Sequence, residues 1–253
     1  MRALLLAAGR GQRMRPLSDT VAKPLLPAGG RRLIEWQIDA MVRAGIADIV
    51  INTAHLAAQI EEALGDGTHY GARLRYSREG VHAGDALETL GGIVKALPLL
   101  GAEPFVIASS DIVTDFDYAQ LAAPAAAIAR GDLDAHLVLV ENPPYHPQGD
   151  MGMMPGMMPG MIPGTVPGEG ATFAPGPAAG TALVTRAAPL LTYANIGVLA
   201  PRLFAGLAPE RARLFPWLYA SVDRGRVGAQ RWQGRWWNVG TPQDLAMVDK
   251  ILR

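Results

Sequence analysis

The first residues of this chain combine glycines with cationic side chains. Gly9 and Gly11 interrupt the short apolar run of residues 3–8, and cations follow within fourteen positions of Gly9: Arg10, Arg13, Arg15 and Lys23. Glycine lets backbone N–H groups come close to an anion, and cationic side chains neutralise the charge of that anion. This spacing therefore predicts a binding site for a polyphosphate.

Two common phosphate-binding motifs are excluded at this loop. A dinucleotide fingerprint, G-x-G-x-x-G, needs a third glycine for close helix–strand packing, and Met14 stands at that position. A Walker loop needs Gly-Lys followed by Ser or Thr, and no such triplet follows Gly11. The glycine loop is thus expected to hold phosphates in another way.

The composition indicates a globular protein. Of the 253 residues, 49% are hydrophobic and 18% are charged, which is typical of globular and not of disordered chains. The net charge is zero, so we expect no nucleic-acid partner, although residues 1–32 carry six Arg and one Lys against one Asp. The absence of cysteine excludes thiolate metal sites and a cysteine nucleophile. No apolar stretch approaches the ~20 residues of a membrane span, and the N-terminal run is too short for a signal peptide, so we expect a cytoplasmic protein.

Strand and helix patterns alternate along the chain. Apolar runs predict strands over residues 3–8, 48–53, 73–77, 105–108, 136–140, 192–199 and 227–232. Apolar residues at helical spacing predict helices near 34–42, 56–64, 89–97, 118–130 and 215–224, and Thr241 can cap a last helix over 242–252. This order predicts a mostly parallel sheet covered on both faces. Ligands of such sheets bind where strands end, so we expect the glycine loop and Asp111 at one edge.

The segment of about 151–190 interrupts this alternation. Residues 151–180 hold eight Gly, six Pro and six Met, with Glu169 as the only charge. Proline removes backbone donors and glycine raises the entropy cost of ordering, so neither helix nor strand is expected. We predict a mobile surface loop, either a low-complexity expansion or, through its methionines, an adaptable binding flap.

Several long motifs together resemble the sugar-1-phosphate nucleotidyltransferase family. They are residues 6–17 (LAAGRGQRMRPL), 23–27 (KPLLP), 87–92 (LETLGG), Asp111 after its strand, and 236–241 (WWNVGT). Within that family the chain is most similar to the short N-acetylmuramate 1-phosphate uridylyltransferases of cell-wall recycling, on residues 51–56, 63–67, 95–101 and 140–143. The resemblance implies a single domain over 1–253, a Rossmann-like three-layer α/β sandwich with a mixed, mostly parallel central sheet.

The resemblance also implies a reaction and its residues. A sugar 1-phosphate oxygen attacks the α-phosphate of a nucleoside triphosphate, which the most similar members imply to be UTP, and pyrophosphate leaves. Arg15 is implied to stabilise the pyrophosphate, Lys23 to bridge phosphates, and Asp111 with Asn238 to bind Mg²⁺. The implied nucleotide-binding residues are Ala8, Gly9, Gly11, Gln12, Arg13, Glu88 and Gly91, and the implied substrate-binding residues are Thr89, Ser110, Asn142 and Asn195.

Asn238 departs from the family pattern, which often has Asp there. Either Mg²⁺ then binds more weakly, or Asp111, the phosphates and water supply most of its ligands. Two alternatives to the uridylyltransferase stay open. One is the same chemistry with another pair, a mannose- or heptose-1-phosphate guanylyltransferase or a glucose-1-phosphate uridylyl- or thymidylyltransferase; the other is a non-catalytic member that binds nucleotide sugars. We expect no membrane partner, and a monomer or small homo-oligomer.

Overall fold

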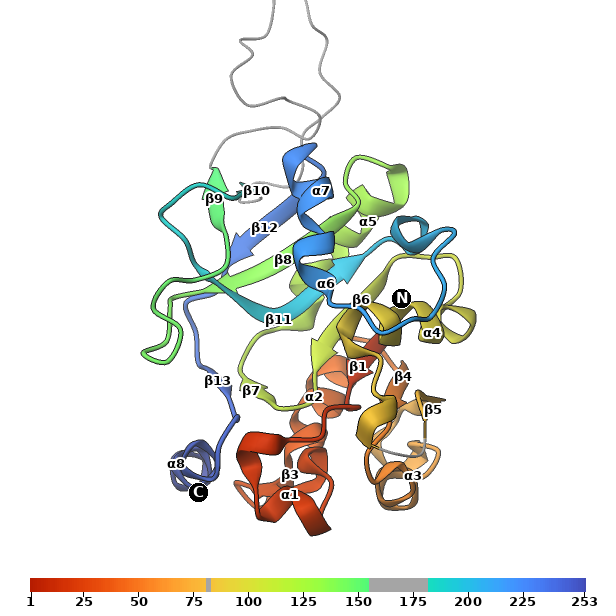
Figure 1. Cartoon of the computed structure of the whole chain (residues 1–253), viewed down its shortest axis with the longest axis vertical. Coiled ribbons are helices and arrows are strands. Elements are labelled where there is room, and N and C mark those ends of the chain that lie inside the picture. Colours follow the sequence, from red (N-terminus) through yellow and green to blue (C-terminus); the bar gives the residue numbers. More distant parts are fainter. Residues whose placement is uncertain (81–82, 155–181) are drawn as a thin grey trace, which may run out of the picture.

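The computed structural model describes residues 1–80, 83–154 and 182–253. Within these residues a nine-stranded sheet has the order β5-β4-β1-β6-β11-β8-β12-β10-β9 (Figure 1). Its strands are β1 (Arg2–Leu6), β4 (Asp48–Thr53), β5 (Arg73–Arg78), β6 (Phe105–Ser109), β8 (Ala135–Val140), β9 (Gly152–Met154), β10 (Ala182–Thr185), β11 (Thr192–Leu199) and β12 (Val227–Arg231).

The sheet is mixed and mostly parallel, as predicted. β5, β4, β1 and β6 are parallel neighbours, and β12 is parallel to β8. β11 runs antiparallel to both β6 and β8, and β10 runs antiparallel to β12 and β9. The apolar runs in β1, β6 and β8 are almost entirely buried, which is typical of strands covered on both faces.

Helices cover both faces of this sheet and make the expected three layers. One buried cluster joins α2, α3 and α5 to the sheet through residues such as Ile34, Ile60 and Ile128. The opposite cluster joins α4 and α6, through Ile93 and Leu214. The helices are α1 (Leu17–Thr20), α2 (Leu33–Arg43), α3 (Ala57–Leu64), α4 (Glu88–Leu100), α5 (Ala122–Arg130), α6 (Leu214–Trp217), α7 (Tyr219–Asp223) and α8 (Pro242–Leu252).

A third, smaller cluster joins the two ends of the chain. β13 (Trp236–Asn238) pairs with β7 (Ile112–Thr114), and α8 lies beside the N-terminal turns that carry β2 (Pro27–Ala28) and β3 (Arg31–Arg32), as Figure 1 shows. Met14 is fully buried in this cluster. The residue that excludes a dinucleotide fingerprint is therefore the apolar anchor of the glycine loop.

The predicted loop over 151–190 is wrong at both of its ends. Residues 152–154 form β9 and residues 182–185 form β10, and the two strands pair antiparallel with Met154 opposite Leu183. These ends contain no proline, and β12 offers a strand edge to which β10 can add its hydrogen bonds. Residues 155–181 lie outside the described residues, so the prediction for them stays a prediction.

The helix predicted over 215–224 is also wrong, because it is split. It is replaced by the short helices α6 and α7, which are interrupted at Leu218. Phe215 has the extended dihedrals φ −105° and ψ 136° inside α6, so continuous helical backbone begins only at Pro216, a residue tolerated in the first turn of a helix. By contrast, α8 has its predicted bounds, and the Thr241 hydroxyl accepts the Asp244 N–H at 3.2 Å. No helix in the described ranges is long and apolar enough to cross a membrane.

Candidate active site

A cavity of about 770 Å³ opens where β1, β4 and β6 end. β1 and β6 are in a register that sets Leu6 opposite Ser109. The glycine loop after β1 therefore lies beside Ser110 and Asp111 after β6, as the sheet topology predicts. The predicted residues that line this cavity are Ala8, Gly9, Gly11, Gln12, Arg13, Lys23, Glu88, Thr89, Ser110 and Asp111.

The backbone conformation at Gly11 and two hydrogen bonds to its carbonyl fix the shape of the glycine loop. Gly11 has a φ of +66°, a left-handed conformation that favours glycine. The Ser18 hydroxyl and the Met14 N–H both donate to the Gly11 carbonyl, at 2.7 and 2.8 Å. Within the described residues, the N–H groups of Gly9, Arg10 and Gly11 donate no hydrogen bond. Such adjacent free donors are suited to phosphate oxygens.

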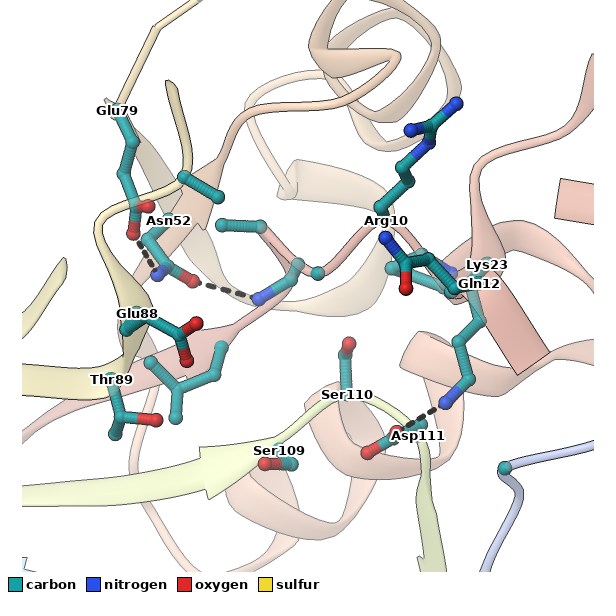
Figure 2. A pocket seen from close by; sticks show the side chains of 18 of the residues that line it. Arg10, Gln12, Lys23, Asn52, Glu79, Glu88, Thr89, Ser109, Ser110 and Asp111 are labelled. Carbon is teal, nitrogen blue, oxygen red and sulfur yellow. Dashed lines mark hydrogen bonds and ion pairs between the residues drawn. The ribbon is translucent and has the colours of Figure 1, made fainter. Parts of the chain in front are cut away.

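Lys23 and Asp111 form an ion pair in the lining of the cavity. The Lys23 ammonium lies 2.5 Å from an Asp111 carboxylate oxygen, and the two side chains are only 12% and 25% exposed (Figure 2). Arg10 and Arg13 also line the cavity, and neither forms an ion pair within the part of the chain that the structure describes. These four side chains therefore combine one carboxylate with three cations, a local charge balance suited to an anion such as a triphosphate.

Arg15 is not brought into this cavity. Its guanidinium lies 2.9 Å from the Asp19 carboxylate, and both side chains are about half exposed. The residue follows the short turn of residues 12–14, whose buried member is Met14. The role implied for Arg15 stays a prediction, and Arg13 is the arginine of this turn that faces the cavity.

A buried polar network forms the wall opposite the Lys23–Asp111 pair. Asn52 accepts the Ala7 N–H at 2.7 Å and donates from Nδ2 to Glu79 at 2.5 Å (Figure 2). The second Glu79 oxygen accepts the Leu87 N–H at 2.7 Å. Burial raises the pKa of Glu79, and its hydrogen bonds oppose that shift. Sequence reasoning missed both residues, although Asn52 lies in the predicted strand 48–53 and Glu79 follows the predicted strand 73–77 by two positions.

A second pocket, of about 250 Å³, adjoins the cavity. The two share Leu6, Glu88, Thr89 and Ser109, and the pocket adds Tyr193, Asn195 and Arg213. In the described chain Arg213 has no ion-pair partner, whereas Arg211, which lines the first cavity, lies 3.5 Å from Glu88. Neither arginine stands in a motif, so no sequence signal identified them.

Two residues that line these pockets have strained backbones. Glu88 and Asn195 have φ values of +59° and +57°, which are rare for side-chain-bearing residues. The register of β11 against β8 shifts between Tyr193 and Gly197, so Asn195 lies in a β-bulge. Strain and bulges of this kind accumulate at functional sites, where they re-aim side chains. Both residues are therefore well placed to contact a substrate.

Gly91 and Asn142 lie outside both pockets. A Cβ atom at Gly91 would collide with the Glu210 carbonyl, so glycine is required there for close packing of two backbone segments. The Asn142 side chain donates to the Leu190 carbonyl at 3.0 Å and accepts the Thr192 hydroxyl at 2.9 Å. Its polar atoms thus stabilise the connection between β8 and β11, and the binding roles implied for both residues stay predictions.

Asn238 lines a third pocket, of about 340 Å³, together with Tyr145 and Asp244. Its strand continues into Val239, whose N–H donates to the Asp111 carbonyl at 2.9 Å. The Asn238 Oδ1 atom is buried and has no hydrogen-bond partner in the described residues. Those residues contain no cluster of three or more His, Cys, Asp or Glu that could hold a metal. The available donors, one carboxylate and one amide oxygen, suit Mg²⁺, which usually keeps waters and phosphate oxygens as further ligands.

Comparison with known proteins identifies the family to which this chain is similar. Residues 2–152 match the model of the family described as nucleotidyl transferase. The N-acetylmuramate alpha-1-phosphate uridylyltransferase of Neisseria meningitidis serogroup B is 40% identical over 242 residues, 95% of this chain and 94% of that protein. The enzyme of the same name from Caulobacter vibrioides is 31% identical over 95% of this chain and 92% of that protein.

A solved structure supports the fold independently. The putative glucose-1-phosphate thymidylyltransferase from Bacillus anthracis, determined in complex with a sucrose, superposes with a TM-score of 0.75. The match covers 100% of this chain and 96% of that chain at 16% sequence identity. At so low an identity the likeness concerns the fold alone, and it agrees with the three-layer sandwich.

Proposed function

This chain belongs to the nucleotidyl transferase family of sugar-1-phosphate nucleotidyltransferases, and we propose that it makes UDP-N-acetylmuramate from UTP and N-acetylmuramate 1-phosphate. The observation that carries the proposal is the pair of adjoining pockets with a shared wall. The first contains the glycine loop and its cations, and the second contains Arg213 and Asn195. Two contiguous sites, each with cationic side chains, suit a reaction between two phosphate-bearing substrates.

The glycine loop takes the triphosphate in this proposal. The free N–H groups of Gly9 and Gly11 donate to phosphate oxygens, and Arg13 adds charge from the same loop. Lys23 neutralises charge near the α-phosphate, where the sugar phosphate oxygen attacks. Arg15 would have to leave Asp19 to reach the departing pyrophosphate. Comparing Arg13→Ala with Arg15→Ala tells which arginine acts there: the acting residue is the one whose loss lowers kcat.

The second pocket takes the sugar phosphate. Arg213 pairs with its phosphate or with the lactyl carboxylate that distinguishes N-acetylmuramate, and Asn195 with Thr89 contacts sugar hydroxyls. Ser110 is 3% exposed, lines the first cavity, and follows Ser109, which lines both pockets. Support for this sugar comes from the two relatives of 40% and 31% identity that carry the activity in their names.

Asp111 and Asn238 would hold Mg²⁺. The residues fit the ion, since Asp111 keeps one carboxylate oxygen that Lys23 does not contact and the buried Asn238 Oδ1 has no other partner in the described chain. When bound, Mg²⁺ supplies charge neutralisation for the phosphates. The protein's part is to hold the two phosphates in line and to keep Lys23 beside them.

A substrate panel scored by pyrophosphate release tests the proposal. UTP with N-acetylmuramate 1-phosphate should react fastest, ahead of UTP or dTTP with glucose 1-phosphate and GTP with mannose 1-phosphate. Faster release with any of the other pairs would reassign the substrates within the family. Binding of UTP by calorimetry without pyrophosphate from any pair would favour a non-catalytic member.

A further inference from the structure

The buried polar network of Asn52 and Glu79 connects two parts of the lining of the first cavity (Figure 2). At one end, Asn52 accepts the N–H of Ala7, which directly follows β1 and leads into the glycine loop, at 2.7 Å. At the other end, Glu79 accepts the N–H of Leu87, which directly precedes Glu88 and the start of α4, at 2.7 Å. Two side chains therefore join the glycine loop to the first turn of α4.

Close packing leaves this network little freedom to move. Asn52 and Glu79 are only 3% and 7% exposed. A Cβ atom at Gly92 would collide with the Glu79 Oε1 atom and the Asn52 Nδ2 atom, so the backbone of α4 packs directly against both side chains. The Glu79 backbone is fixed as well, because its N–H donates to the Thr53 carbonyl at 2.7 Å and its carbonyl accepts the Lys95 ammonium at 3.2 Å.

The donors and acceptors of this network require one amide and one carboxylate. Ala7 and Leu87 each present an N–H donor at its ends. The Asn52 amide turns its oxygen to Ala7 and its NH₂ group to Glu79, at 2.5 Å, and the carboxylate accepts with both oxygens. Two amides would not fit, because each would turn its oxygen to a backbone N–H and the two NH₂ groups would face each other. The pattern is complete with the carboxylate at either of the two positions.

We propose that Asn52 and Glu79 are positioning residues that fix the glycine loop at a set separation from Glu88 and Thr89. In the proposed function, on which this inference rests, the glycine loop binds the triphosphate. Glu88 and Thr89 line both the first cavity and the second pocket, where the sugar phosphate binds. Attack on the α-phosphate needs the reacting atoms about 3–3.5 Å apart, so a change in this separation acts on kcat.

Exchange of the amide and the carboxylate tests the inference, with kcat measured by pyrophosphate release. Glu79→Gln brings two NH₂ groups together, so kcat should fall about 100-fold, as when a reacting group is displaced by about 1 Å. Asn52→Asp sets two carboxylates against each other and should also lower kcat. The double variant Asn52→Asp/Glu79→Gln gives every N–H an acceptor again, so it should regain about 10-fold or more of the kcat lost in Glu79→Gln.

A matched control removes another hydrogen bond to a glutamate. The Tyr70 hydroxyl donates to Glu35 at 2.7 Å, and Tyr70 lines none of the pockets described above. Tyr70→Phe should therefore keep the wild-type kcat. Circular dichroism checks that each variant is folded, and if Glu79→Gln does not fold, Asn52→Asp supplies the same comparison with the double variant.

The affinity for UTP separates positioning from direct contact with the nucleotide. The calorimetric Kd for UTP should stay near the wild-type value in Glu79→Gln and in the double variant. A double variant as slow as Glu79→Gln would overturn the inference, and so would UTP binding that weakens equally in both, because the Glu79 carboxylate would then bind the nucleotide itself. Both results would leave the proposed function standing. A wild type that releases no pyrophosphate from any pair of the panel would overturn the proposed function, and the inference with it.

Discussion

The two edges of the sheet at which its parallel strands start and end differ in whether their arginines form ion pairs within the protein. At the starts of the strands, Arg2, Arg73 and Arg75 all bond the Asp48 carboxylate, at 2.9, 2.7 and 2.9 Å. At the ends of the strands, Arg13 and Arg213 face the pockets and form no ion pair within the described residues. At the first edge the arginines are paired with a carboxylate of the protein, whereas at the second edge these two cations are available to bind an anionic ligand.

The lesson is that arginine content alone does not identify a phosphate site. Burial by itself would raise the pKa of Asp48, yet its three arginine bonds hold it at about 2. Those arginines serve stability, because their charge is already neutralised within the protein. In the proposed function, Arg13 and Arg213 gain an ion-pair partner from a substrate.

The largest effect should come from the carboxylate at the ligand edge. Asp111→Asn removes the proposed Mg²⁺ ligand and the partner of Lys23, so kcat should fall about 10³-fold or more, as for loss of a major electrostatic group. Pyrophosphate release with UTP and sugar phosphate measures it. Asp48→Asn is the matched control, and its kcat should stay near that of the wild type. Similar losses of kcat in Asp111→Asn and Asp48→Asn would contradict the distinction between a ligand-binding edge and a structural edge.

Arg213 should give the next largest effect. Arg213→Ala removes a charge-assisted hydrogen bond worth about 1.5–3 kcal/mol, so KM for the sugar phosphate should rise about 10- to 100-fold. KM for UTP should change little, since Arg213 lines only the second pocket. Arg73→Ala, at the other edge, should leave both KM values unchanged. A rise in KM for UTP alone would move Arg213 to the nucleotide.

Stability should respond at the Asp48 edge. Asp48→Asn leaves three arginines with no common anion, and because the cluster is partly exposed we expect a loss of about 1–2 kcal/mol in the free energy of unfolding. Urea unfolding followed by circular dichroism measures this loss. Arg213→Ala should unfold at the wild-type midpoint. A destabilised Arg213→Ala would mean that its side chain has a structural partner after all.

The smallest effect is the pH dependence of the same edge. The pKa of Asp48 falls from 3.8 to about 2 on folding, so its contribution is complete above pH 4 and is lost as the pH falls towards 2. The stability difference between wild type and Asp48→Asn should therefore shrink between pH 5 and pH 2.5. A difference that stays constant over this range would show that the arginines do not set the pKa of Asp48.

The fold could be predicted well where local pattern and tertiary context agree. The apolar runs of β4 and β11 and the proline-first, Thr241-capped α8 have the bounds expected from sequence. The secondary-structure predictions are wrong where neighbouring strands or local backbone conformation outweigh the amino-acid composition. Gly152–Met154 becomes a strand because a neighbouring strand is available to pair with it. The helix predicted over 215–224 begins instead with an extended Phe215 and is interrupted at Leu218, so two short helices stand in its place.

Residue types and their spacing were enough to indicate a glycine loop with cationic neighbours, an acidic residue at the same end of the parallel strands and the motifs of the family. These follow from residue types at short spacing, since a glycine, a proline or a buried strand acts within a few positions. Which charged side chains lack an ion-pair partner among the described residues follows only from the tertiary structure. Whether Asp48 meets three arginines, or Arg213 lacks an ion-pair partner among the described residues, depends on strands and loops far apart in the chain, because Coulomb energy depends on distances in space.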